Sequence, residues 1–230
     1  MSICAIPKLT PYWWEEAPLS SSQATNPTAL PQKVDIAIIG AGFTGLTAAL
    51  ILAKAGWHVV LFDAQRAGEG ASSRNGGICS GNLKPSYRKL VNLFGEDFAK
   101  SVYGEGIAAR KSLARLIEDE KIECHFSMNG RFSGANKPKH YDSMARECDD
   151  LVKHLGIEAY MIPRAEQHKE IGSDLYYGGA VRSDIGSLHP GLFHKELLAR
   201  VKTLGVEIYD QCPITKLTPS DTKKTTELYS

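Results

Sequence analysis

Residues 34–63 constrain the fold of this chain more than any other segment. Residues 34–39 (VDIAII) form a nearly continuous apolar run with β-branched side chains, which is typical of a strand buried on both faces. A glycine-rich turn and an apolar helical stretch follow, and Gly56 is placed to end that helix. Residues 57–62 (WHVVLF) have the composition of a second buried strand. Together these thirty residues predict a strand–helix–strand unit of the usual size.

The turn of this unit carries the pattern G-x-G-x-x-G at residues 40–45 (GAGFTG), and Asp63 follows 18 positions after Gly45. The pattern alone is weak, but here it leaves a buried strand and opens a helix. Gly40 permits a tight turn, Gly42 leaves room for a diphosphate beside the backbone, and Gly45 lets helix and strand pack closely. Free N–H groups at the helix start would hold the diphosphate, and Asp63 would accept hydrogen bonds from the adenosine ribose. The unit therefore predicts a dinucleotide site. The alternative is a glycine turn that only packs helix on strand.

The segment after Asp63 indicates the type of dinucleotide. No second G-x-G-x-x-G occurs, so we expect a single bound nucleotide. A carboxylate at Asp63 would repel a 2′-phosphate, which disfavours NADP. Residues 66–77 (RAGEGASSRNGG) form a second loop rich in backbone amides and hydroxyls, which suits a longer cofactor. This loop favours FAD over NAD; the alternative is a surface loop with an Asn-Gly turn.

Composition excludes several classes of protein. Lys plus Arg number 27 and Asp plus Glu number 26, so bulk charge favours neither nucleic-acid nor membrane-surface binding. The five cysteines show no C-x-x-C spacing, so we expect no disulfide framework and no metal site, and the thiols fit a cytoplasmic protein. Residues 34–53 contain three glycines and Asp35, which makes them too polar for a membrane span, and the N-terminal residues do not resemble a secretory signal.

The remaining pattern predicts an N-terminal arm followed by alternating elements. Proline and small polar residues make residues 1–33 an extended arm, in which Trp13 and Trp14 either pin the arm to the body or form a partner-docking peptide. A short helix is expected after Pro163, and the chain after Leu217 is expected to be a frayed polar tail. The other expected helices are 86–94, 97–120, 138–155 and 190–204, and the other expected strands lie near 124–126, 130–133, 158–162, 176–182 and 206–209.

Three segments support a family resemblance. DIAIIGAGFTGLTAAL, LFDAQR and GASSRNGG resemble the N-terminal half of the D-amino-acid-oxidase-like FAD oxidoreductases, most of all the γ-glutamylputrescine oxidase type. PYWWEE, YYGGAVRSDIGSLHP and GLFHKELLARVKTLGVEIYD agree with the same family, so the resemblance covers roughly residues 11–217. The first motif is shared by many flavoproteins, whereas the RNGG loop and the GG…LHP passage are more specific.

The resemblance implies an α/β fold of the GR2 flavoprotein type. We expect a Rossmann-like FAD-binding domain made of residues 34–123 and 183–217, part of an α+β substrate domain at 124–182, the arm at 1–33 and a polar tail at 218–230. Family members are far longer than this chain, so we expect a truncated product or a gene fragment. We also expect exposed apolar surface where the other half would pack.

The resemblance also implies a reaction and a set of cofactor contacts. Hydride passes from a carbon next to nitrogen to the flavin, the imine is hydrolysed by water, and O2 is the expected electron acceptor. No catalytic residue is predicted; His189 and Cys79 are better explained as a helix start and a small buried side chain. The alternatives are a non-catalytic nucleotide-binding fragment or interaction module and an NAD-dependent dehydrogenase. The predicted cofactor-binding residues are Gly40, Ala41, Gly42, Phe43, Thr44, Gly45, Asp63, Ala64, Arg66, Ser72, Ser73, Arg74, Asn75, Gly76 and Gly77.

Overall fold

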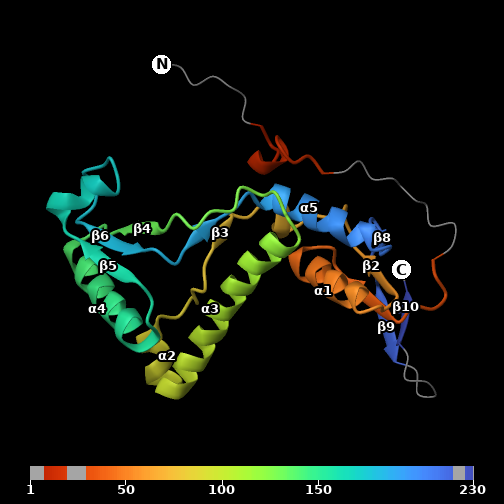
Figure 1. Cartoon of the computed structure of the whole chain (residues 1–230), viewed down its shortest axis with the longest axis horizontal. Helices are drawn as coiled ribbons and strands as arrows, with labels where there is room; N and C mark the ends of the chain where they lie inside the picture. Colours follow the sequence, from red (N-terminus) through yellow and green to blue (C-terminus); the bar gives the residue numbers. More distant parts are fainter. Residues whose placement is uncertain (1–7, 20–29, 220–225, 230) are drawn as a thin grey trace. The chain divides into compact units, whose positions relative to one another are not determined.

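The computed structural model describes residues 8–19, 30–219 and 226–229 (Figure 1). Within these residues the chain divides into two compact units. Unit 1 is drawn from Met1–Gly76, Ile122–Cys124 and His189–Ser230, and unit 2 from Gly77–Lys121 and His125–Leu188. Each unit contains its own sheet, so the two are described separately.

A parallel three-stranded sheet forms the centre of unit 1. Its strands are β1 (Ile36–Ile39), β2 (Val59–Phe62) and β8 (Glu207–Tyr209), in the order β1-β2-β8. Ile36 lies opposite Val59, and Val60 lies opposite Glu207. All four residues of β2 are buried, as expected for a central parallel strand that is apolar on both faces. The three strands predicted for this region are confirmed.

Helices α1 (Phe43–Lys54) and α5 (Pro190–Thr203) lie side by side in unit 1 (Figure 1). Helix α5 starts with Pro190 in its first turn, and Nδ1 of His189 accepts a hydrogen bond from the Leu192 amide, so His189 is the N-cap. The apolar faces of the two helices are buried at Leu46, Ala49 and Leu50 of α1 and at Phe193, Leu197, Leu198 and Val201 of α5.

The C-terminal segment corrects one expectation. Residues 218–230 were expected to form a frayed polar tail, but β9 (Lys216–Pro219) and β10 (Thr226–Tyr229) pair antiparallel as a separate two-stranded sheet. The two strands form through backbone pairing, with Thr226 opposite Pro219. The polar composition of these segments did not indicate this pairing. Two single-turn helices, η1 (Tyr12–Trp14) and η2 (Ala71–Ser73), complete unit 1.

Unit 2 combines an antiparallel sheet with three α-helices and one short helix. Its sheet has the order β4-β6-β5, from β4 (Arg131–Gly134), β6 (Gly179–Arg182) and β5 (Ala159–Ile162), and β3 (Ile78–Cys79) pairs separately with β7 (Gly186–Ser187). Helix α4 (Pro138–Leu155) packs on β5 and β6, and it ends at Gly156 in the left-handed conformation (Figure 1). The other helices are α2 (Tyr87–Phe94), α3 (Glu96–Asp119) and the short η3 (Arg164–Lys169).

The compact units divide the chain at other positions than the predicted FAD-binding and substrate domains. Residues 77–121 and 183–188, predicted in the FAD-binding domain with 34–123 and 183–217, lie in unit 2, and the domain boundaries stay a prediction. The reason for the different division is a shared core in which Tyr87, Leu90, Ala99 and Tyr103 of α2 and α3 pack with Leu151 of α4. The strand expected at 124–126 is wrong: the nearest pairing is an isolated bridge between Ser127 and Ser187.

Candidate functional site

The glycine loop between β1 and α1 has the close contacts that its sequence predicts. Gly40 has φ +103°, a left-handed conformation that strains residues with a side chain. A Cβ on Gly45 would lie 1.9 Å from the carbonyl oxygen of Gly40, so only glycine fits between helix and turn. Both residues therefore build the bend from which α1 starts.

The N-terminus of α1 presents backbone amides at Gly42 and Phe43. A Cβ on Gly42 would lie 2.8 Å from Oγ of Ser72, so this position also lacks room for a side chain. The Phe43 amide donates to Oγ of Ser72 at 3.0 Å. The Gly42 amide has no acceptor among the described residues. An uncommitted N–H at the positive end of a helix dipole is suited to an anion.

Asp63, at the end of β2, is hydrogen-bonded to the glycine loop. Its Oδ2 accepts the Ala41 amide at 2.7 Å, and its Oδ1 accepts the Gln65 amide at 2.9 Å. The sequence indicated ribose recognition for this carboxylate and gave no sign of a structural role. Each carboxylate oxygen can accept a further hydrogen bond, so the bracing leaves capacity for a ligand hydroxyl.

The second loop is held by the N-terminal arm. Ser73 is buried; its hydroxyl donates to the Gly68 carbonyl at 2.6 Å and accepts from Nε1 of Trp14 at 2.7 Å. Nε1 of Trp13 donates to the Asn75 backbone carbonyl at 2.8 Å, and the side-chain Nδ2 of Asn75 donates to the Ser72 carbonyl at 2.9 Å. The prediction that the indoles pin the arm to the body is confirmed.

The other residues predicted along the cofactor differ in their surroundings. Arg66 pairs with Glu69, its Nε lying 3.0 Å from Oε2, and this hydrogen bond lowers the pKa of the Glu69 carboxyl. Ala64, Arg74 and Gly76 are exposed in unit 1. Gly77 is buried and belongs to unit 2, where its carbonyl accepts the Leu188 amide at 2.8 Å.

A recess of about 340 Å³ lies beside Arg66. It is lined by Thr10, Trp14, Glu15, Pro18, Leu19 and Arg66. The docked arm therefore supplies most of one small cavity next to the second loop.

His194 is a residue of this site that the sequence analysis did not identify. It lies on α5, it is 2% exposed, and its Nε2 is 2.8 Å from the Ala41 carbonyl oxygen. Burial lowers the pKa of His194, while the nearby Ala41 carbonyl and Asp63 oppose that effect. The available signal was a histidine between apolar positions on the inward face of a helix, which is also typical of an ordinary core histidine.

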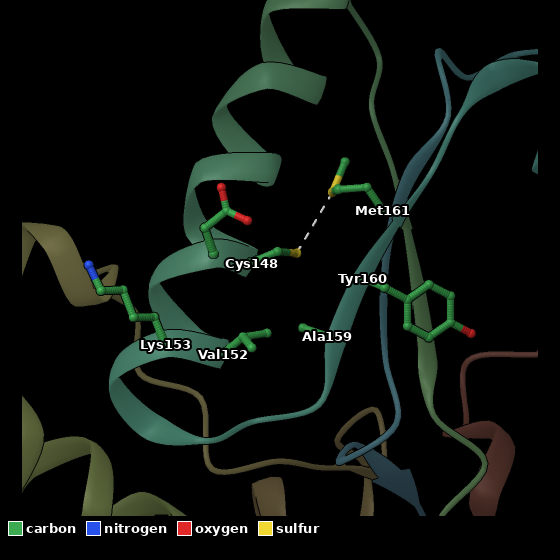
Figure 2. Close-up of a pocket in the computed structure, with 7 residues that line it drawn as sticks. Cys148, Val152, Lys153, Ala159, Tyr160 and Met161 are labelled. Atoms are coloured by element: carbon green, nitrogen blue, oxygen red, sulfur yellow. Dashed lines mark hydrogen bonds between the residues drawn. The ribbon is translucent and has the colours of Figure 1, made fainter.

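Unit 2 contains a larger recess of about 620 Å³ between α4 and β5 (Figure 2). Sγ of Cys148 and Sδ of Met161 face each other there at 3.7 Å. Burial raises the pKa of the Cys148 thiol, so the sulfur stays protonated and is not an activated nucleophile. The remaining lining residues are Asp149, Val152, Lys153, Ala159 and Tyr160.

Two further features are absent from the described ranges 8–19, 30–219 and 226–229. No helix in them is both long and apolar enough to cross a membrane. They also contain no group of three or more His, Cys, Asp or Glu side chains arranged to hold a metal ion.

The fold and the glycine loop define a class of protein. A parallel sheet, a glycine turn opening a helix and a carboxylate at the end of the second strand are typical of dinucleotide-binding α/β proteins. Residues 35–228 match the DAO family, described as FAD dependent oxidoreductase. The chain belongs to this family of FAD-dependent oxidoreductases, and the predicted resemblance is confirmed. FAD, favoured over NAD from the second loop, is the cofactor of this family.

Individual relatives agree with this assignment. The chain is 30% identical over 185 residues to the probable oxidoreductase OrdL of Haemophilus influenzae, covering 80% of this chain and 42% of the relative. It is 25% identical over 183 residues to the γ-glutamylputrescine oxidoreductase of Escherichia coli, covering 80% and 43%. The chain therefore spans less than half the length of these curated relatives.

Solved structures have the same fold. Glycine oxidase from Geobacillus kaustophilus matches with a TM-score of 0.70 at 18% identity, covering 85% of this chain and 50% of that one. L-amino acid deaminase from Proteus vulgaris matches with a TM-score of 0.66 at 21% identity, covering 84% and 43%. The predicted α/β flavoprotein fold is thus confirmed.

Proposed function

We propose that this chain binds the ADP half of FAD at the glycine loop and belongs to an oxidoreductase that oxidises an amine or an amino acid. The observation that carries the proposal is the uncommitted Gly42 amide at the start of α1, in a loop braced by Asp63. An anion is the ligand that such an amide and helix terminus attract. The diphosphate of FAD is that anion in this family.

The residues around Gly42 fit a diphosphate. The missing Cβ lets a phosphate oxygen approach the backbone, and Ser72 lies beside it. Ser72 uses its oxygen to accept the Phe43 amide, so its hydroxyl hydrogen remains available to donate to the diphosphate. In this proposal Gly42 and Ser72 bind the diphosphate, and Gly40, Ala41, Phe43, Thr44 and Gly45 shape the loop.

Asp63 is proposed to accept a hydrogen bond from a ribose hydroxyl. Its two oxygens each accept one backbone amide and retain further acceptor capacity. The same negative charge would repel a 2′-phosphate, which agrees with FAD and disfavours NADP.

The second loop is proposed to extend along the diphosphate and the flavin. Ser73 would act through its backbone, because Trp14 and Gly68 already engage its hydroxyl. Arg74 is exposed and is available to approach an anion. The other residues proposed along the cofactor are Ala64, Arg66, Asn75, Gly76 and Gly77.

The reaction class is proposed from the family. Bound FAD supplies a hydride acceptor for a C–H bond next to nitrogen, and O2 is the proposed final acceptor. The names of the relatives, glycine oxidase, L-amino acid deaminase and γ-glutamylputrescine oxidoreductase, support a nitrogen-bearing substrate. We also propose a cytoplasmic location, since Cys79, Cys124, Cys148 and Cys212 are buried and outside any disulfide.

A non-catalytic nucleotide-binding module is the second candidate. The observation that favours it is that the glycine loop and Asp63 lie together in unit 1, in a site that needs no substrate-binding residue. Such a module would retain FAD without turning over an amine. Substrate oxidation therefore separates the two candidates.

A matched glycine pair tests cofactor binding. Gly42→Ala places a methyl group 2.8 Å from Oγ of Ser72, whereas Gly104→Ala, in α3, adds a methyl group to open space. We expect the unmodified chain and Gly104→Ala to bind FAD more tightly than NAD by titration calorimetry, and Gly42→Ala to weaken FAD binding at least about tenfold. Equal FAD affinity for all three proteins, or no affinity for FAD and ADP, contradicts the proposed site.

Turnover is tested on the same FAD-loaded protein. Hydrogen peroxide formation is measured with a panel of primary amines, glycine derivatives and D- and L-amino acids. Peroxide with any of these supports the oxidoreductase. FAD binding without flavin reduction by any of these compounds supports the non-catalytic module.

A further inference from the structure

We propose that His194 is a positioning residue for FAD: it fixes the peptide between Ala41 and Gly42 so that the Gly42 amide faces the diphosphate. The inference rests on the proposed function, because it assigns an orienting group to the same loop. His194 comes from α5, far along the chain from the glycine loop, and the fold brings the two together.

The hydrogen bond between His194 and Ala41 has a defined direction. The Ala41 carbonyl can only accept, so Nε2 of His194 carries the hydrogen and donates at 2.8 Å. The ring is 2% exposed, and water therefore does not compete for this carbonyl. The interaction fixes both the tautomer of the ring and the direction of the carbonyl.

Peptide planarity carries that direction to Gly42. The peptide is trans, so the Ala41 carbonyl and the Gly42 N–H point in opposite directions. With the carbonyl held by His194, the N–H points away from the buried ring. Asp63 holds the preceding peptide through the Ala41 amide at 2.7 Å, so the loop is fixed on both sides of Ala41.

His194 also sets the position of the second loop. Gly68 has φ +86°, and a Cβ there would lie 2.5 Å from Cε1 and 2.6 Å from Nδ1 of His194. The Gly68 carbonyl in turn accepts the Ser73 hydroxyl at 2.6 Å. One buried ring thus contacts both loops proposed to hold the cofactor. An apolar side chain of the same size could fill this space, but it could not donate a hydrogen bond to Ala41.

Two polar substitutions separate the hydrogen bond from side-chain volume. In His194→Gln the amide nitrogen is as many bonds from the backbone as Nε2, so the variant can still donate to Ala41. In His194→Asn the amide nitrogen matches Nδ1 and does not reach. Val201→Ala, at a fully buried position of the same helix, is the stability control because Val201 is not part of the loops.

The measurement is the dissociation constant of FAD and of ADP, together with the melting temperature of each apoprotein. We expect His194→Asn to weaken both ligands about tenfold, His194→Gln to stay within about threefold of the unmodified chain, and Val201→Ala to lower the melting temperature without weakening binding. If His194→Asn does not fold, His194→Leu at a temperature below its melting transition replaces it with the same expected loss.

Three results would overturn the inference. His194→Asn could bind like the unmodified chain, His194→Gln could lose as much affinity as His194→Asn, or Val201→Ala could lose as much as either. A different result, in which the unmodified chain binds neither FAD nor ADP, contradicts the proposed function itself.

Discussion

Gly45 is constrained by the backbone it contacts. Its missing Cβ would stand 1.9 Å from the Gly40 carbonyl oxygen and 3.2 Å from Cγ2 of Ile38. Neither the turn nor the strand can move without separating α1 from β1. The three tryptophans of the chain, Trp13, Trp14 and Trp57, all lie in unit 1, so their fluorescence reports the unfolding of this unit.

Gly45→Ala is therefore expected to destabilise unit 1 by about 1–3 kcal/mol through overpacking. The measurement is urea unfolding followed by tryptophan fluorescence. Gly104→Ala, in unit 2 and facing open space, should leave the fluorescence transition where it is. An unchanged midpoint for Gly45→Ala would show that the close contact relaxes without cost.

His194 makes the stability of unit 1 depend on pH. Its pKa in the folded chain lies below the ordinary value of 6.5, mainly because of burial. Below about pH 6.5 the unfolded chain takes up a proton that the folded chain does not, so the free energy of unfolding falls as pH falls until the folded ring is also protonated. Above that range the effect is absent, because the ring is neutral in both states.

The expected result is a difference in the pH dependence of unfolding between the unmodified chain and His194→Gln. Between about pH 7.5 and about pH 5.5, the unfolding free energy of the unmodified chain should fall further than that of His194→Gln, which lacks the titrating ring. Urea unfolding at the two pH values measures this. Parallel pH dependence in both proteins would mean that other groups dominate.

The residues of the site were predictable only where their determinants are local. Residues 40–45 and Asp63 lie within one strand–helix–strand unit, so their spacing alone predicts the turn and the carboxylate. His194 contacts Ala41 across 153 positions, and no periodicity in the sequence links them. The hydrogen bond from the Ala41 amide to Asp63 was not predicted either. An aspartate at this position is explained by ribose binding, so the sequence does not show that its carboxylate also accepts a backbone amide.

At the scale of a single element, the short helix η1 of the N-terminal arm is attached to the second loop. Nε1 of Trp14 donates a hydrogen bond to the Ser73 hydroxyl, which in turn donates to the Gly68 carbonyl in the second loop. Trp14→Phe keeps an aromatic ring at this position and removes the donor. Loss of this hydrogen bond should destabilise the docked arm by about 0.5–1.5 kcal/mol.

Limited proteolysis measures the expected effect, as faster cleavage within residues 8–19 of Trp14→Phe. Tyr12→Phe is the control, because Tyr12 is 75% exposed on the same short helix. Equal cleavage rates for Trp14→Phe and the unmodified chain would show that ring packing, not the hydrogen bond, docks the arm.

Long periodic elements and short apolar strands were predictable, whereas two-residue strands and the polar C-terminal strand pair were not. Helix α4 was expected at residues 138–155 and has those bounds, because apolar side chains recur on one face and proline begins it. Strands β3 and β7 have two residues each, too few to show an alternation. The β9–β10 pair depends on backbone hydrogen bonds between two polar segments, which composition does not reveal.

At the scale of the whole molecule, unit 1 exposes several large apolar side chains, one of them on an edge strand of its sheet. Within the described residues, β1 pairs only with β2, so its other edge has no partner strand. Ile39 at the end of β1 is 53% exposed, and Trp57 and Ile51 are 53% and 61% exposed. An unpaired apolar edge strand is a template for association.

The isolated chain should therefore bind a hydrophobic fluorescent dye and self-associate as its concentration rises, measured by dye fluorescence and light scattering. Ile39→Thr keeps a β-branched residue on the strand but removes apolar surface, so it should lower both signals. Leu175→Thr is the matched control, since Leu175 is 71% exposed in unit 2 and outside every strand. A monodisperse chain that unfolds cooperatively and binds no dye would mean that this edge does not associate, and the exposed Ile39 would then need a structural explanation within unit 1 itself.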